Sequence, residues 1–386
     1  MKRGVWLAVP LRAALPALAA GGFLLAGCST RDPALTKPAE LVEIKGAVSV
    51  TERWRATIGN SRGAALQPAV LGNAVYAAAA NGTVARINPA DGRVVWEISV
   101  ETRLSAGVGS DGLTLAVATP RGEVIALAPD GKELWRARVT SDVTAPPLVG
   151  QGLVIVRSTD HRVAAFDAAS GKRRWLFQRS QPPLTLRAPT EMTFAGDNVL
   201  VGFPGGRLVA IALANGAARW EAAVAEPKGT TEVERLADVV GPVVAFDRDV
   251  CAAAFQGRVM CGDITTGNLR WSRDLSAGAG PAVGERAVVA VEARSQVLAF
   301  EREGGAALWR NELLRNRQLT TPLIMPRSVV VADVEGYVHF LSPADGSFLA
   351  RARADNSPIV ARPQRWNDEI LVQSQDGVLT LLALGR

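Results

Sequence analysis

Few residues of this chain combine the types and spacing that catalysis requires. The 386 residues include only two histidines, the side chain that most often moves protons near neutral pH. His161 occupies a turn position that glycine fills in comparable segments, and His339 lies in a predicted strand, so we expect both to be structural or exposed. Gly59–Gly63 matches the G-x-S-x-G pattern, but that motif needs a strand, a turn, a helix and a histidine partner. We expect the match to be accidental.

Acidic and basic side chains show no catalytic or ligand-binding pattern. Asp247 and Asp249 stand two residues apart, and we interpret them as solvated acids of a turn. The glycines follow hairpins rather than forming a phosphate-binding loop. Lysine and arginine form no block with interleaved aromatic residues, which disfavours nucleic-acid binding. We therefore expect no catalytic residue, no metal, no cofactor and no nucleic-acid partner.

The amino-terminal residues predict a cleaved secretory signal peptide over residues 1–27. Met1-Lys2-Arg3 precedes an apolar stretch ending at Cys28, and Leu25-Ala26-Gly27-Cys28 resembles the bacterial lipobox, whose cysteine is acylated. A transmembrane helix would need about 20 apolar residues, whereas Pro16 and Gly21-Gly22 interrupt this stretch. We therefore expect a lipidated Cys28 that anchors the chain without spanning the membrane.

The residues beside the cleavage site indicate where the anchor lies. Ser29 is not the aspartate that resembles an inner-membrane retention signal, so we expect the periplasmic face of the outer membrane. Cleavage would remove Lys2, Arg3 and Arg12 but no acid, which lowers the formal charge from +6 to +3. The high isoelectric point is therefore partly a property of the signal peptide.

Two further cysteines, Cys251 and Cys261, flank a predicted hairpin turn at Gln256-Gly257. In an oxidising periplasm they can form a disulfide if they lie opposite one another. A register one residue different would turn one of them to the other face of the sheet. The sequence leaves both outcomes open.

An internal repeat dominates the chain and predicts its fold. The most regular copy, Asn81–Trp96, contains a glycine turn, a short strand, a second glycine turn and a tryptophan. Further copies end on a tryptophan or its equivalent, as follows: Gly122–Trp135, His161–Trp175, Gly206–Trp220, Gly257–Trp271, Ser295–Trp309 and Gly336–Ala350. Each repeat of roughly 40 residues holds four strand signals, and dipeptides such as Asn81-Gly82 are typical of tight hairpins.

Two incomplete copies at the ends predict a closed ring. An eighth copy begins at Asp376-Gly377, and the chain stops before its tryptophan, while the strand around Trp54 has no hairpin before it. Pairing these fragments would bury the strand edges that an open array exposes. We predict an all-β fold over residues 47–386, an eight-bladed β-propeller of four-stranded antiparallel blades, closed by the amino-terminal strand and the carboxy-terminal hairpin. Residues 28–46 would form a lipidated tether.

The repeated tryptophans are expected to dock one blade onto the next, since each buries on the order of 200 Å². They are Trp54, Trp96, Trp135, Trp175, Trp220, Trp271 and Trp309. In the seventh copy Ala350 stands at this position, with Phe348 the nearest aromatic residue. We predict that the seventh blade docks most weakly.

The repeat also resembles the tryptophan-docking motif of quinoprotein alcohol dehydrogenases, which carry pyrroloquinoline quinone on an eight-bladed propeller. That resemblance raises an enzyme as an alternative. The family stacks its quinone against a disulfide of adjacent cysteines, above a calcium site. Cys251 and Cys261 are not adjacent here, and the inserted segments that build those active sites are missing.

The connections between repeats point to a binding surface. The longest, residues 221–241, and its neighbour, residues 176–188, should emerge from adjacent blades on one face. The 176–188 connection contains Leu184 and Leu186 beside Arg187, although such a loop should be polar. Exposed leucines next to an arginine are typical of an interface. The alternative is that the loop tucks its leucines beneath itself.

The whole pattern resembles the BamB family, the lipoprotein subunits of the outer-membrane β-barrel assembly (BAM) machinery. The specific matches are Leu184-Thr185-Leu186-Arg187 and Gly229–Asp238. In that family, an L-x-L-R loop and an acid after R-L-x support contact with the POTRA domains of the barrel subunit BamA. The resemblance implies Leu184, Leu186, Arg187 and Asp238 as contact residues of a non-catalytic scaffold that assists folding and insertion of outer-membrane proteins. Other subunits would be contacted indirectly, and contact with unfolded clients stays open.

Two departures from the family pattern affect this surface. The family often has D-V-D where this chain has Asp238-Val239-Val240, and glycine tends to follow the arginine where Ala188 stands. The apolar and basic character of the first loop is retained. Two other functions remain alternatives: a quinoprotein-like enzyme, and a propeller that binds another envelope ligand such as peptidoglycan.

Overall fold

Short apolar runs separated by glycine-containing turns form the strands of this protein. The computed structural model describes Met1 and residues 37–180, 182–186 and 188–385. Cys28 and residues 2–27 of the predicted signal peptide lie outside the described residues. Pro38–Arg386 forms one compact unit. Among the described residues, none forms a helix long and apolar enough to cross a membrane.

The strands form eight four-stranded antiparallel sheets, the blades, which we number along the chain. Blade one contains β2 (Ala69–Leu71), β3 (Ala74–Ala78), β4 (Thr83–Ile87) and β5 (Val94–Ser99). Blade two contains β6 (Gly109–Ser110), β7 (Leu115–Ala118), β8 (Glu123–Leu127) and β9 (Glu133–Arg138). Blade three contains β10 (Leu148–Gly150), β11 (Leu153–Arg157), β12 (Val163–Asp167) and β13 (Arg173–Phe177). Blade four contains β14 (Thr193–Ala195), β15 (Asn198–Phe203), β16 (Arg207–Ala212) and β17 (Ala218–Ala223).

The second half of the ring repeats the same order. Blade five contains β18 (Val239–Phe246), β19 (Asp249–Ala254), β20 (Gly257–Asp263) and β21 (Leu269–Leu275). Blade six contains β22 (Ala277–Val283), β23 (Ala287–Glu292), β24 (Val297–Glu301) and β25 (Ala307–Asn311). Blade seven contains β26 (Leu323–Ile324), β27 (Val329–Ala332), β28 (Tyr337–Leu341) and β29 (Phe348–Arg353). Blade eight contains β30 (Gln364–Trp366), β31 (Glu369–Gln373), β32 (Val378–Leu384) and β1 (Val50–Thr57).

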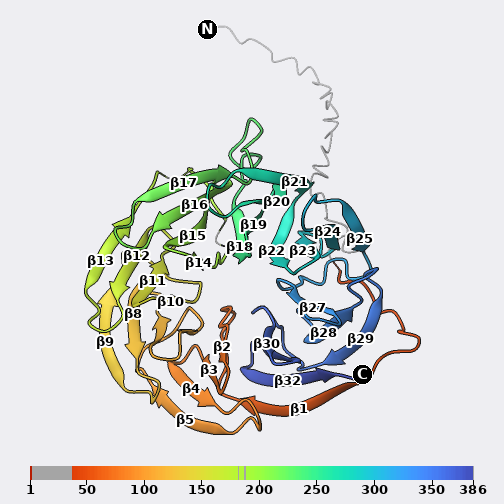
Figure 1. The fold of residues 1–386 in the computed structure, drawn as a ribbon, viewed down its shortest axis with the longest axis horizontal. Helices are drawn as coiled ribbons and strands as arrows, with labels where there is room; N and C mark the ends of the chain where they lie inside the picture. The colour runs from red at the N-terminus through yellow and green to blue at the C-terminus, as the bar shows by residue number, and fades with distance from the viewer. Residues whose placement is uncertain (2–36, 181, 187, 386) are drawn as a thin grey trace. The chain divides into compact units, whose positions relative to one another are not determined.

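The blades follow one another around a ring, with the first strand of each toward the centre and the last at the rim (Figure 1). The ring closes where β1 pairs antiparallel with β32, with Trp54 opposite Leu381. The predicted eight-bladed propeller and its closure are therefore confirmed. Because the strands are antiparallel, the turns between the second and third strands share a face with the connections between blades, and the other turns lie on the opposite face.

Tryptophans join neighbouring blades, and the apolar core lies between the blades. Trp135, for example, packs against Phe166 of the next blade, with ring centroids 6.0 Å apart. Indole Nε1 groups donate to backbone carbonyls of the following blade in the pairs Trp54–Pro89, Trp96–Pro129, Trp135–Ala168, Trp175–Leu213, Trp271–Arg302 and Trp309–Pro343. The indole Nε1 of Trp220 has no hydrogen-bond partner among the described residues.

Each docked indole lies on a glycine of the next blade's outer turn. Gly92 has a φ of +74°, and a Cβ atom there would lie 2.7 Å from the Trp54 ring. Only glycine combines this backbone conformation with so close an approach. The glycine turn and the tryptophan of successive repeats are thus two halves of one contact.

The structure explains the missing tryptophan of blade seven. A tryptophan at Ala350 would have to dock on the outer turn of blade eight, but no such turn exists, because β32 ends near the carboxy terminus and β1 begins a separate segment. The incoming chain lies there instead: the backbone N–H of Val48 donates to the Leu349 carbonyl at 2.8 Å, and Gly385 donates to Ser49 at 2.7 Å. Weak docking of blade seven stays a prediction.

Residues 38–49 lie along blade seven. Arg317 donates from Nη1 to the Ala39 carbonyl at 2.7 Å, and Arg351 donates from Nη1 to the Val42 carbonyl at 3.0 Å. Arg317 is itself buried and pairs with Asp333 at 2.6 Å. Residues 38–46, which the sequence assigned to the tether, therefore pack with the propeller unit.

The predicted structural role of His339 fits its position in β28. The side chain is fully buried, and its Nε2 lies 2.8 Å from Oδ2 of Asp333. Burial lowers the pKa of His339, while Asp333 opposes that effect. The histidine thus belongs to the same buried cluster as Arg317.

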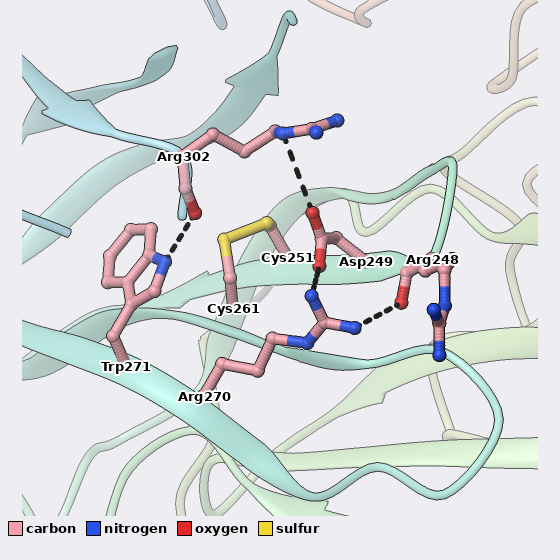
Figure 2. The surroundings of a disulfide bond; sticks show 7 residues. All are labelled: Arg248, Asp249, Cys251, Cys261, Arg270, Trp271 and Arg302. Carbon is pink, nitrogen blue, oxygen red and sulfur yellow. Dashed lines mark hydrogen bonds and ion pairs between the residues drawn. A yellow bond between two sulfur atoms is a disulfide. The ribbon is translucent and has the colours of Figure 1, made fainter. Parts of the chain in front are cut away.

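Cys251 of β19 and Cys261 of β20 are joined in a disulfide (Figure 2). The two residues stand directly opposite each other in the strand pairing, with Cα atoms 4.2 Å apart. Both are buried in the layer between blades five and six, beside Trp271. The register that the sequence left open therefore brings both cysteines to one face.

The interpretation of Asp249 as a solvated turn acid was wrong. Asp249 is buried at the start of β19. Its carboxylate oxygens lie 2.8 Å from Arg270 and 3.6 Å from Arg302 (Figure 2). Arg302 comes from the next blade, so the acid helps to join two blades, a contact that the spacing of Asp247 and Asp249 did not reveal.

Candidate functional site

Two connections between blades meet on one face of the ring. The 178–192 loop leads from β13 to β14, and the 224–238 loop leads from β17 to β18. The second is visible in Figure 1 as the projection beyond blades four and five. The backbone N–H of Leu186, in the first loop, donates to Oδ2 of Asp238, in the second, at 2.6 Å. The structure therefore brings together the two loops that the sequence analysis predicted to lie on one face.

Asp238 lies beneath this surface rather than on it. Asp238 is only 3% exposed. Its other carboxylate oxygen, Oδ1, accepts a hydrogen bond of 3.1 Å from the backbone N–H of Gly205. Burial raises the pKa of Asp238, while the two N–H donors and the charge of Arg157 act in the opposite direction. The carboxylate holds the 178–192 loop in place and supports a contact indirectly.

The two predicted leucines differ in exposure. Leu184 is 42% exposed, whereas Leu186 is half-buried and packs against the core that includes Val240. Leu184 thus matches the expectation of an exposed interface leucine, and Leu186 matches the alternative of a leucine tucked beneath its own loop. Arg187 lies outside the described residues, and its role stays a prediction.

Val240 accounts for one departure from the family pattern. It stands where the second acid of the D-V-D pattern would be, and it is buried beneath Leu186. An apolar residue here adds contact area under the loop, which a carboxylate would not provide. At this position the 178–192 loop is therefore supported by apolar packing and not by a second carboxylate.

The 224–238 loop is ordered by its own side chains. Oε2 of Glu234 accepts hydrogen bonds from the backbone N–H groups of Thr230 and Thr231, at 2.8 and 3.0 Å. These bonds lower the pKa of Glu234 to about 2. Val233 is 61% exposed at the same turn, so this loop adds a second apolar side chain to the exposed surface.

A polar bridge near the centre of the ring holds the base of the 178–192 loop. Glu191 forms an ion pair of 3.0 Å with Arg362, which lies just before β30. Arg362 also donates to Oε1 of Gln67 at 3.2 Å. These contacts connect the segments that precede blades one and eight to the base of the loop.

A pocket of about 250 Å³ opens beside the 178–192 loop. Thr185 and Leu186 form one side of it, and Arg157 and His161 of blade three form another. Sequence reasoning missed these two residues as a functional pair. The available signal was the histidine at a turn position filled by glycine in other repeats, and indeed His161 has a φ of +61°.

The residues do not match the quinone site of the quinoprotein dehydrogenases that the sequence analysis described. The disulfide joins two strands and is fully buried, so no planar group can stack against it. Within the described part of the chain, no group of three or more histidine, cysteine or acidic residues could hold a metal ion.

Known proteins resemble this chain over most of its length. The family model described as outer membrane protein assembly factor BamB matches residues 10–102, 80–311 and 293–384. The outer membrane protein assembly factor BamB of Bordetella pertussis is 44% identical over 365 residues, covering 94% of this chain and 95% of that protein.

Solved structures of other proteins share this propeller architecture. The crystal structure of BamB from Moraxella catarrhalis superposes with a TM-score of 0.80 at 27% identity, covering 87% of this chain and 100% of that one. A quinohemoprotein alcohol dehydrogenase from Comamonas testosteroni superposes with a TM-score of 0.69 at 15% identity, covering 87% of this chain and 77% of that one. The second likeness concerns the fold alone.

Proposed function

The chain belongs to the family of the outer membrane protein assembly factor BamB, and we propose that it binds the POTRA domains of BamA through the loop surface around Leu184. It is an outer membrane protein assembly factor of the BAM complex. The finer proposal concerns which residues make the contact and what the contact does.

One observation carries this proposal: Leu184 is exposed on a loop that is held rigidly from below. Asp238 binds the backbone of the loop, and Leu186 packs beneath it. A preorganised apolar side chain loses little freedom on binding, so more of its burial contributes to affinity. We infer that Leu184 enters an apolar groove of the partner and that Arg187 pairs with an acid there.

The proposal describes a scaffold without catalysis. The protein would help BamA to fold and insert outer-membrane proteins, and other subunits would be held through BamA. We propose that acylated Cys28 anchors it on the periplasmic face of the outer membrane. The described residues do not favour the quinoprotein-like alternative, because the buried disulfide does not resemble that cofactor site.

Co-purification of BamA from cells that express the full chain tests the contact. Truncating a central interface residue costs about 2 kcal/mol or more, which is roughly a 30-fold loss of affinity. Leu184→Asp should therefore abolish recovery of BamA, and a photo-crosslinker at position 184 should join the two proteins. Recovery at the wild-type level would contradict the proposal.

Leu113 provides the matched control. This leucine is 78% exposed in the turn between β6 and β7, on the face opposite the two loops. Leu113→Asp changes surface polarity in the same way but should leave BamA recovery unchanged. Crosslinking of position 184 to another envelope component, with none to BamA, would instead favour the propeller that binds a different ligand.

A further inference from the structure

The pocket beside the 178–192 loop contains a half-buried cation, Arg157, that forms no ion pair with an acid of the described residues. Arg157 ends β11, and burial lowers its pKa to about 10. The charge of Asp238 partly offsets this effect of burial, but the Asp238 carboxylate binds the N–H groups of Leu186 and Gly205 and forms no ion pair with Arg157. Nε of Arg157 is buried without a hydrogen-bond partner. A buried charge that lacks a close counter-charge is costly. An anion entering this pocket would remove much of that cost.

The guanidinium is held in one orientation by its neighbours. Its Nη2 donates to Nδ1 of His161 at 2.9 Å, and its Cζ lies 5.6 Å from the centre of the Phe203 ring. Because Nδ1 of His161 accepts this bond, its Nε2 carries the proton and lies 3.4 Å from Oγ1 of Thr185. The histidine thus links the cation to the loop.

The other polar side chains of the pocket are compatible with a carboxylate. Ser141 and Thr159 also line it, and their hydroxyls share a hydrogen bond of 2.8 Å. Asp160 is the one acid at the wall among the described residues. It accepts hydrogen bonds from Thr140 and Ser158 and pairs with Arg162 at 3.4 Å, so its charge is already compensated.

From this arrangement we propose that the pocket receives an acidic side chain of the protein that docks on Leu184. The proposal rests on the proposed function and names a second contact within that interface. Thr185 and Leu186 form both the pocket wall and the loop, so a bound segment that covers Leu184 passes the pocket mouth. The volume of about 250 Å³ lies below the range of about 300–1,000 Å³ typical of small-molecule sites, and it suits a single side chain.

The first test removes the charge of Arg157 in the full chain and measures BamA recovered from detergent-solubilised membranes. Arg157→Gln should lower BamA recovery about tenfold. The difference between the variant and the wild-type protein should become smaller as the salt concentration rises. The thermal unfolding midpoint should show that the fold is intact. Wild-type recovery by Arg157→Gln, together with loss by Leu184→Asp, would overturn this inference and leave the proposed function standing. Wild-type recovery by both variants would overturn the two together.

Arg302 supplies a matched control for packing. Its guanidinium also lies over an aromatic ring, that of Phe246, at 5.0 Å, but it pairs with Asp249 and does not line the pocket. Arg302→Gln should recover BamA at nearly the wild-type level. An equal loss in both variants would assign the effect to a general loss of packing and contradict the acidic-side-chain proposal.

A second variant tests the pocket without touching Arg157, in case Arg157→Gln does not fold. Ser141→Glu places a carboxylate of the chain's own in the pocket, so it should raise the unfolding temperature and exclude the partner's acid. Ser141→Gln has the same size without the charge. The proposal requires that the Glu variant be more stable and recover less BamA than the Gln variant, and equal behaviour of the two would overturn it.

Discussion

The carboxylate of Asp238 accepts a 2.6 Å hydrogen bond from the backbone N–H of Leu186, 52 residues earlier in the chain. This bond ties the connection after blade three to the connection after blade four. Leu184, two residues away, is exposed while the backbone beneath it is held. The acid of the family motif thus shapes the surface on which the leucine stands.

Removing the Asp238 carboxylate should loosen the loop. Asp238→Ala would leave the partly buried N–H groups of Leu186 and Gly205 without their acceptor. A fully buried group in that state costs about 1–3 kcal/mol, so we expect a loss toward the lower end for each. We expect lower stability to urea, faster proteolysis within residues 178–192 and reduced BamA recovery. Asp197→Ala, at an exposed turn on the opposite face, should behave like wild type, and a loop equally resistant in both variants would contradict this role.

The contact between glycine and tryptophan can be separated from backbone strain. Gly92 and Gly152 have nearly equal φ angles, +74° and +75°, but only a Cβ at Gly92 would strike a tryptophan. Gly152→Ala should cost about 1 kcal/mol for the backbone alone, and Gly92→Ala should cost several kcal/mol, because Trp54 must move. Thermal unfolding measures both, and equal losses would show that the indole contact adds nothing.

The disulfide should stabilise blade five. Removing a native bridge typically costs about 2–4 kcal/mol, although the short separation between Cys251 and Cys261 places the expected loss at the low end. A reductant should lower the denaturation midpoint of the wild-type protein. The double variant Cys251→Ala/Cys261→Ala should have that lower midpoint with or without reductant. A midpoint that is insensitive to reductant in the wild-type protein would oppose the prediction.

Acid should destabilise the protein partly through His161. Burial, and then the charge of Arg157, lower the pKa of His161 to about 4, while Asp160 opposes them. The unfolded chain, with a histidine pKa of about 6.5, therefore binds a proton more readily than the folded one. Stability contributed by His161 is present above pH 6.5 and is lost as the pH falls toward 4.

The glycine variant tests that pH dependence. His161→Gly suits the positive φ of +61°, so it should fold, and it should lose less stability than wild type between pH 7.5 and pH 4.5. His339 is present in both proteins, so the difference between them isolates His161. Parallel stability curves would count against the prediction.

Blade seven, which lacks the docking tryptophan, should exchange its amide hydrogens faster than the other blades. Arg317 bonds both Asp333 and the Ala39 carbonyl, so Arg317→Gln should speed exchange in residues 38–49 and in β26–β29 specifically. Breaking a buried ion pair from one side typically costs about 3–5 kcal/mol. Finding blade seven to be the slowest to exchange would refute the prediction of weak docking.

The repeat alone determined the architecture, since each blade is built from local signals. A glycine turn, a short apolar strand and a tryptophan lie within one repeat, and each blade contacts chiefly its neighbours. The unmatched strand of Trp54 and the unmatched hairpin of Gly377 therefore predicted both the number of blades and the closure. The lengths of the connections likewise identified the surface where the two loops meet.

Only the tertiary structure decided which particular side chains meet. The opposition of Cys251 and Cys261 depends on strand register, and the burial of Asp249 depends on an arginine from the next blade. The bond from Leu186 to Asp238 and the pocket around Arg157 join residues of different blades. Repeats and local patterns carry no information on such contacts, because they form only when packing brings distant segments of the chain together.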